Sequence, residues 1–165
     1  MGQMCTIQAA DGHTLAAWET ERSTHPYAVV VLQEIFGVNH HIRSVCERFA
    51  QAGFHVIAPA LFDRVERGVE LEYTTDGVQQ GLALRAQIPL AKTLLDVQAA
   101  ARALNARRVG VIGYCWGGTL AWNAACQTDD FAAAVGWYGG GIAAHKDETP
   151  HCPVQLHFGE RDTSI

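Results

Sequence analysis

The chain has 165 residues, of which 48% are apolar and 18% are charged, and its net charge is −5. This length and composition predict a single globular domain over residues 1–165, with enough residues for a sizeable core. No basic block occurs, so we do not expect nucleic acid as a partner. No apolar run is long enough for a membrane helix, and the N-terminus lacks the pattern of a signal peptide.

The cysteine and histidine patterns argue against a disulfide framework and against a metal site. The chain has five cysteines, an odd number, and no Cys-x-x-Cys pair. Its eight histidines are scattered and show no spacing that is typical of metal ligands. A free thiol favours a reducing compartment, so we expect a cytoplasmic location.

The N-terminal segments predict a β-hairpin followed by a buried strand. Residues 5–9 and 14–19 flank the dipeptide Asp11-Gly12, which is typical of hairpin turns. Residues 27–33 form a continuous apolar run, as expected of a strand buried on both faces.

Helices and strands alternate over the rest of the chain. After a loop at 34–39, apolar residues at helical spacing predict a helix that ends before Gly53. The expected elements that follow are a strand at 55–58, a long connection over 60–90 with a short helix near 77–86, an amphipathic helix around 94–104, a strand at 108–114, a helix at 119–125, and strands at 131–138 and 154–158. This alternation predicts the α/β class, with a mainly parallel sheet and helices on both faces.

Several polar side chains follow predicted strands directly. In open sheets of this kind, ligands bind at the carboxyl ends of the strands. The residues that occupy such positions are Glu34, Cys115, Tyr138 and Asp162. We therefore expect these four residues to lie near one site.

Residues 109–118 carry the most informative motif, in which a β-branched run ends in glycines around Cys115. A strand, a sharp elbow and a helix in this order match the layout of the Gly-x-Ser-x-Gly turn of hydrolases, with cysteine in place of serine. The central residue of such an elbow has strained, usually positive-φ geometry, so its neighbours must lack side chains. We expect the helix N-terminus to favour a thiolate at Cys115. The glycine spacing fits neither a phosphate-binding P-loop nor a dinucleotide fingerprint.

A cysteine nucleophile needs an imidazole base, a carboxylate that orients this base, and two N–H groups for the oxyanion. Trp116 follows the nucleophile and supplies one N–H, and the loop that begins at Glu34 is placed to supply the other. Asp162 is the candidate orienting carboxylate, and its alternative role is that of a turn or capping residue. The alternative for Glu34 is an exposed surface carboxylate.

Four segments together resemble the dienelactone hydrolase family of α/β-hydrolases, and they run in family order over nearly the whole chain. They are Gln33-Glu34-Ile35-Phe36-Gly37-Val38-Asn39, Gly113-Tyr114-Cys115-Trp116-Gly117-Gly118, Trp137-Tyr138-Gly139 and His157-Phe158-Gly159-Glu160-Arg161-Asp162. The resemblance implies an α/β-hydrolase fold and a Cys-His-Asp triad that hydrolyses small esters or lactones. It implies no cofactor and no metal, and it implies a monomer.

The resemblance also implies roles for individual residues. Cys115 corresponds to the nucleophile, Asp162 to the triad acid, and Glu34 to a carboxylate that governs the ionisation of the resting cysteine. The backbone N–H groups of Ile35 and Trp116 correspond to the oxyanion hole. The side chains assigned to the substrate pocket are Tyr138 and Phe36.

The resemblance is incomplete after Asp162. The triad histidine of the family lies downstream of the acid, and no histidine of this chain matches its motif, since His157 is expected to pack within a strand. The chain is therefore expected to be a fragment that lacks the last helices and strand, with little or no hydrolase activity alone; the alternative is a short protein that has lost catalysis. Arg64, Arg67 and Arg85 are candidates for holding a substrate carboxylate, although solvation at the surface is the expected role.

Two other functions fit part of the pattern. Glutamine amidotransferases also use a Gly-x-Cys-x-Gly elbow, but the His-x-Glu pair that should follow it is missing from this sequence. A thiol sensor or a binding module on a hydrolase fold needs only an oxidisable Cys115 at a helix N-terminus.

Overall fold

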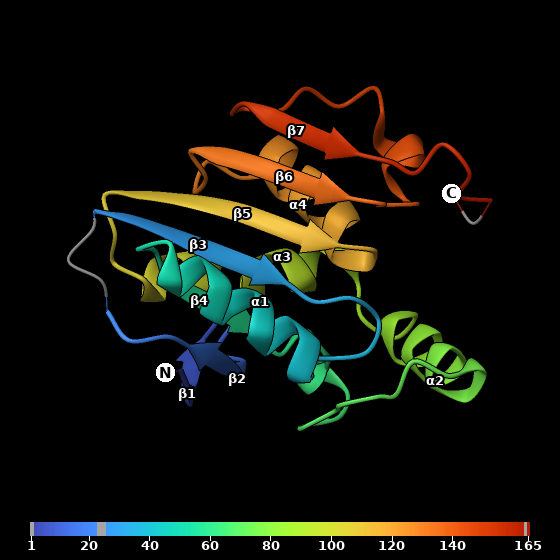
Figure 1. The fold of residues 1–165 in the computed structure, drawn as a ribbon, viewed down its shortest axis with the longest axis horizontal. Helices are drawn as coiled ribbons and strands as arrows, with labels where there is room; N and C mark the ends of the chain where they lie inside the picture. The colour runs from blue at the N-terminus through green and yellow to red at the C-terminus, as the bar shows by residue number, and fades with distance from the viewer. Residues whose placement is uncertain (1, 23–25, 164) are drawn as a thin grey trace.

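The computed structural model describes residues 2–22, 26–163 and 165, and it contains one seven-stranded sheet (Figure 1). The strand order is β1-β2-β4-β3-β5-β6-β7. The strands are β1 (Gln3–Gln8), β2 (Thr14–Glu19), β3 (Tyr27–Leu32), β4 (His55–Pro59), β5 (Arg108–Tyr114), β6 (Ala133–Trp137) and β7 (Val154–His157). β1 and β2 form the predicted antiparallel hairpin, β2 pairs antiparallel with β4, and all later pairs are parallel. The mainly parallel sheet is thereby confirmed.

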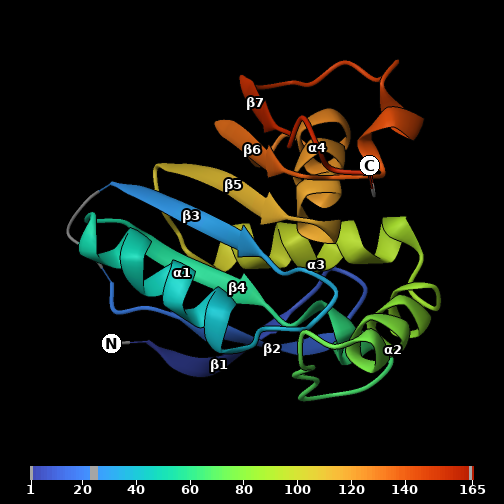
Figure 2. The same ribbon diagram turned by 45° about the vertical axis from the view of Figure 1, so that its right-hand side comes forward.

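Helices cover both faces of the sheet, as predicted (Figure 2). They are α1 (His40–Gln51), α2 (Thr75–Arg85), α3 (Leu90–Ala103) and α4 (Trp116–Gln127), with short 3-10 helices η1 (Leu61–Arg64) and η2 (Ile142–His145). Alternate residues of β3 explain the two layers, because neighbouring side chains of a strand point to opposite faces. Val29 and Val31 join the core under α1, whereas Val30 and Leu32 join the larger core under α3 and α4.

The helix ends follow from local sequence signals. The Asn39 side chain accepts a hydrogen bond from the backbone N–H of Ile42 and caps α1. The chain leaves α1 through Gly53, whose φ of +98° only glycine adopts easily. Thr74 caps α2 in the same way, through Gly77. Within the described residues, no helix has the length and apolar character needed to span a bilayer.

The parallel strands place their carboxyl ends along one edge of the sheet. Figure 1 shows the arrowheads of β3, β5, β6 and β7 pointing the same way, with the C-terminal segment at this edge. Glu34, Cys115, Tyr138 and Asp162 all follow these ends. The predicted convergence of these residues therefore has a structural basis in the sheet topology.

Most element boundaries differ from the predicted ones by one to four residues, and two of the differences concern the surroundings of the site. The helix expected from residue 119 begins at Trp116, because Gly117 and Gly118 lie within its first turn. Glycine is a weak helix former, but here tertiary packing prevails over propensity. The strand expected over 131–138 covers only Ala133–Trp137.

Candidate active site

Cys115 occupies a strained elbow between β5 and α4. Its φ is +54° and its ψ is −115°, which confirms the predicted positive φ. Two backbone hydrogen bonds hold Cys115 in this conformation. The Cys115 N–H donates to the Trp137 carbonyl at 3.0 Å, and the Thr119 N–H donates to the Cys115 carbonyl at 3.2 Å. A non-glycine residue in this region persists only when its surroundings hold it there, which is typical of functional sites.

Glycine is required around the elbow because backbone segments meet there. A Cβ atom on Gly117 would collide with the carbonyl oxygens of Leu32 and Gln33, and one on Gly113 would collide with the Gly117 carbonyl. The start of α4 therefore packs directly on the end of β3. This contact brings the loop after β3 beside Cys115.

Cys115 lines a cavity of about 460 Å³ at the carboxyl edge of the sheet. The cavity also contains Tyr138 and Asp162, which the sequence assigned to the site, together with Trp116. Asp162 lies in an exposed turn in which its N–H donates to the Gly159 carbonyl at 3.1 Å. Asp162 is therefore both a turn residue and a wall of the cavity, so its two proposed roles are compatible.

In this arrangement the Cys115 thiol ionises less readily than an ordinary cysteine thiol. Burial raises its pKa above the usual value, and the negative charges of Glu34 and Asp162 raise it further. The hydrogen bond from the Trp116 backbone N–H and the charge of Arg85 act in the opposite direction but are outweighed. The helix N-terminus favours the thiolate as expected, through the Trp116 N–H, but desolvation of the charged form is the larger effect and the pKa is raised.

Glu34 is buried and is held by two tyrosine hydroxyls. Tyr73 donates to one carboxylate oxygen at 2.6 Å, and Tyr138 donates to the other at 3.3 Å. Asn39 donates in turn to the Tyr73 hydroxyl at 3.3 Å. Burial and this carboxylate raise the pKa of Tyr73 to about 12 and also raise that of Tyr138. Glu34 is thus not an exposed surface carboxylate, and it acts on Cys115 through its charge.

The remaining predicted site residues have different surroundings. Trp116 is buried, and its ring stacks on Phe62 at a centroid distance of 5.4 Å. Ile35 is buried, and its carbonyl packs against Gly81 of α2. Phe36 is a core residue whose ring lies 4.3 Å from that of Tyr73, and it is not among the residues that line the cavity. The structure places Phe36 in the core beside Tyr73, and its role in a substrate pocket stays a prediction.

Two residues that approach the site come from the long connection over 60–90, where the sequence offered Arg85 only as one of three candidate arginines and gave no signal for Tyr73. Arg85 is exposed, as expected, but it lies on the wall of the Cys115 cavity at the end of α2. Tyr73 belongs to the loop before α2, and its hydroxyl donates the hydrogen bond that holds the Glu34 carboxylate. By contrast, Arg64 is paired with Asp96, and Arg67 donates to the Thr14 carbonyl. Arg85 is thus the one of the three candidate arginines that reaches the site.

The described lining of the Cys115 cavity contains no imidazole. His157 stacks on Trp137 at a centroid distance of 3.9 Å and an interplanar angle of 8°, so its predicted packing role is confirmed. Among the described residues, no group of three or more His, Cys, Asp or Glu side chains is placed to hold a metal ion.

Replacing Glu34 by glutamine is expected to increase the alkylation rate of Cys115 by iodoacetamide a few-fold at neutral pH. The substitution removes a negative charge that raises the thiol pKa, so the thiolate fraction grows. Asp162→Asn should act in the same direction but less, and Arg85→Gln should act in the opposite direction. Alkylation is followed by peptide mapping across a pH series. A pH profile of Glu34→Gln that coincides with that of the wild type would contradict the electrostatic role of Glu34.

Comparisons with known proteins identify the family to which the chain is similar. Residues 15–165 match the model of the dienelactone hydrolase family. The chain is 37% identical to a Synechocystis sp. protein with the provisional name carboxymethylenebutenolidase, over 83% of this chain and 62% of that protein. It is 31% identical to the carboxymethylenebutenolidase of Pseudomonas putida, over 95% of this chain and 70% of that protein.

A solved structure supports the same relationship. A Klebsiella pneumoniae protein, provisionally described as a dienelactone hydrolase, superposes with a TM-score of 0.77 at 28% identity, over 99% of this chain and 75% of that chain. The chain spans less than two thirds of the length of the Synechocystis relative. With the family model matching most of its length, this chain belongs to the dienelactone hydrolase family.

Proposed function

We propose that this chain carries the nucleophile of a hydrolase that acts on small carboxylic esters or lactones. The observation that carries the proposal is the positive-φ Cys115 at the N-terminus of α4, facing a cavity that it shares with Asp162 and Tyr138. The family membership supports the same reaction class.

The first half of the proposed reaction forms a thioester. The Cys115 sulfur attacks the ester carbonyl, and the backbone N–H groups of Trp116 and Ile35 stabilise the oxyanion. The C–O bond then breaks, and the alcohol leaves with the proton that the thiol lost. Water cleaves the thioester in the second half and releases the acid. Both halves need an imidazole base, which Asp162 would orient and which the described cavity lining does not contain.

Arg85 provides the charge that an acidic substrate requires. Its guanidinium group is on the same cavity wall as the nucleophile. Several relatives are named for a butenolide lactone that bears a carboxymethylene group. We therefore propose that a substrate carboxylate binds at Arg85 while the lactone carbonyl lies at Cys115. We also propose that the protein acts as a cytoplasmic monomer on this substrate, with no further cofactor.

The test is acylation by a simple activated ester. Incubation with 4-nitrophenyl acetate is expected to add one acetyl group to the protein, and peptide mapping should locate it on Cys115. Because the described cavity lining lacks an imidazole, we expect a burst of nitrophenol followed by slow turnover. All three functions use a nucleophilic Cys115, so a second measurement separates the glutaminase and sensor alternatives from the hydrolase. Glutamine consumption would support the first, and reversible oxidation without ester cleavage would support the second.

A further inference from the structure

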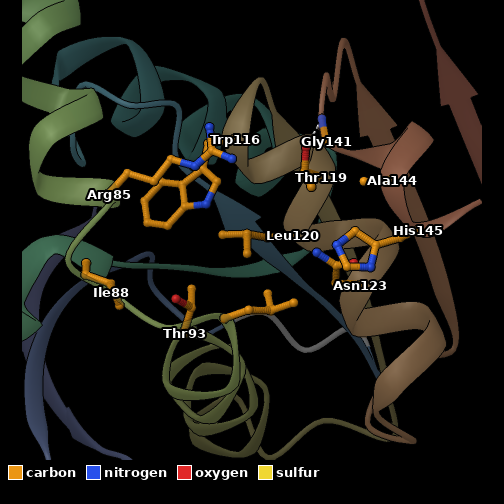
Figure 3. Close-up of a pocket in the computed structure, with 11 residues that line it drawn as sticks. Arg85, Ile88, Thr93, Trp116, Thr119, Leu120, Asn123, Gly141, Ala144 and His145 are labelled. Atoms are coloured by element: carbon orange, nitrogen blue, oxygen red, sulfur yellow. Dashed lines mark hydrogen bonds between the residues drawn. The ribbon is translucent and has the colours of Figure 1, made fainter.

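A second cavity adjoins the Cys115 cavity and extends along α4 away from the nucleophile (Figure 3). Its volume is about 260 Å³, and it lies between α3, α4 and η2. The two cavities are direct neighbours, because four residues line both of them: Arg85, Trp116, Thr119 and Gly141. Figure 3 shows Arg85 and Trp116 at one end and Asn123 and His145 at the other.

Asn123 is the unusual residue of this second cavity. Its side chain is 1% exposed, and its Oδ1 atom has no hydrogen-bond partner among the described residues. A buried acceptor without a donor has lost its hydration with no compensation, so such groups are rare in folded proteins and point to a missing partner. A ligand that donates a hydrogen bond would supply this partner.

Three other polar side chains of the second cavity are already engaged, and Arg85 lies at the end that this cavity shares with the Cys115 cavity. The Thr93 hydroxyl donates to the Pro89 carbonyl at 3.3 Å, and the Thr119 hydroxyl accepts from the Gly141 N–H at 3.1 Å. His145 Nδ1 pairs with Glu148 at 2.7 Å. The remaining wall includes apolar side chains such as Ile88, Leu90 and Leu120. The lining therefore suits a small apolar group that carries one O–H or N–H.

The spacing along α4 allows one molecule to reach both places. Asn123 follows Cys115 by eight residues. At a rise of 1.5 Å per residue, this separation corresponds to about 12 Å along the helix axis. A single aromatic ring directly on the carbonyl is too short for this length, so a substrate that reaches both places has a short linker between its carbonyl and its aromatic group.

We propose that the second cavity is a specificity subsite that receives the far end of the substrate, an apolar group whose hydroxyl or N–H donates to Asn123 Oδ1. The subsite deepens the proposed hydrolase function and rests on it. It selects among small esters by the end opposite to the reacting carbonyl. A hydroxylated substrate binds here in preference to the same substrate with a methyl group in that place.

Two chloroacetamides that differ at one group test the subsite without ester cleavage. N-[para-(hydroxymethyl)benzyl]chloroacetamide carries the donor, and its para-methyl analogue does not. The Cys115 sulfur forms a bond to carbon as the C–Cl bond breaks; chloride leaves, and the thiol proton passes to the buffer. Each rate is divided by that of iodoacetamide, which corrects for thiol reactivity. We expect the hydroxymethyl probe to label Cys115 about fivefold faster than the methyl probe, as one hydrogen bond provides.

Variants locate the source of this preference. Asn123→Leu should abolish it, because leucine fills a similar volume but accepts no hydrogen bond. Ala144→Leu, which fills the cavity from η2 and leaves α4 unchanged, should slow both probes and serves as the second variant if Asn123→Leu does not fold. Equal rates for the two probes in the wild type, or a preference that persists in Asn123→Leu, would overturn the subsite. Acetylation of Cys115 by 4-nitrophenyl acetate is scored separately, so its absence counts against the hydrolase function rather than against the subsite.

Discussion

Replacing Cys115 by alanine is expected to abolish both the nitrophenol burst and the acetylation of the protein by 4-nitrophenyl acetate. Cys115 is the thiol at the elbow and on the cavity wall, whereas Cys46 and Cys126 are buried in the fold. Cys152→Ala provides the matched control, since Cys152 is half-buried like Cys115 but does not line the cavity. The control should keep the full burst.

The pH dependence of the burst gives a further check on the same thiol. Because burial raises the pKa of Cys115, the rate should continue to rise with pH beyond the value at which an ordinary thiol, with a pKa of about 8.5, is half ionised. Alanine, like cysteine, carries a Cβ atom, so the substitution adds no new strain at φ +54°. Circular dichroism and thermal unfolding should therefore match the wild type. Acetylation that persists in folded Cys115→Ala would refute the assignment of the nucleophile.

The elements of the sheet could be predicted because their signals are local. The apolar run before Cys115 gave the boundaries of β5 as observed, Arg108–Tyr114, and Asp11-Gly12 marked the hairpin. The elbow at Cys115 was also predictable, because the glycines around it are needed wherever a strand and a helix meet so closely. Residues that follow parallel strands must meet at one edge, so most of the site could be derived as well.

The parts that the sequence did not reveal depend on contacts between distant segments. Tyr73 and Arg85 reach the site only because α2 packs on the loop after β3, with Gly81 against the Ile35 carbonyl. No periodicity in the connection over 60–90 encodes this contact. The raised pKa of Cys115 similarly depends on how deeply the elbow is covered and on the buried Glu34 charge. Neither quantity can be obtained from residue types and spacing.

The same reasoning applies to a buried ion pair that sequence analysis did not find. Asp96 of α3 is fully buried, and Arg64 of η1 donates two hydrogen bonds to it, both at 2.7 Å. Arg64 also contacts Asp11 in the β1–β2 turn, and Lys92 reaches the same carboxylate at 2.8 Å. The network therefore ties the N-terminal hairpin to α3 across η1.

Replacing Arg64 by methionine is expected to lower the free energy of unfolding by about 3–5 kcal/mol at neutral pH, because it leaves the Asp96 carboxylate buried without its partner. Arg102→Met is the matched control. Arg102 is 59% exposed and lies 3.5 Å from Asp130, so its loss should cost no more than about 1 kcal/mol. Urea unfolding followed by circular dichroism measures both values. Equal losses in the two variants would show that the buried pair does not stabilise the fold.

Acid should reduce the difference between Arg64→Met and the wild type. Burial already raises the pKa of Asp96, and Arg64 opposes this shift, so removing Arg64 raises the pKa further. When the pKa of a carboxyl group is higher in the folded than in the unfolded protein, the folded protein becomes less stable as the pH rises through the folded-state pKa. The variant should therefore be least stable, relative to the wild type, at neutral pH and should recover part of the difference as Asp96 takes up a proton. A double variant, Arg64→Met with Asp96→Leu, removes both charges and should recover most of the loss at every pH, because no unpaired charge then remains buried.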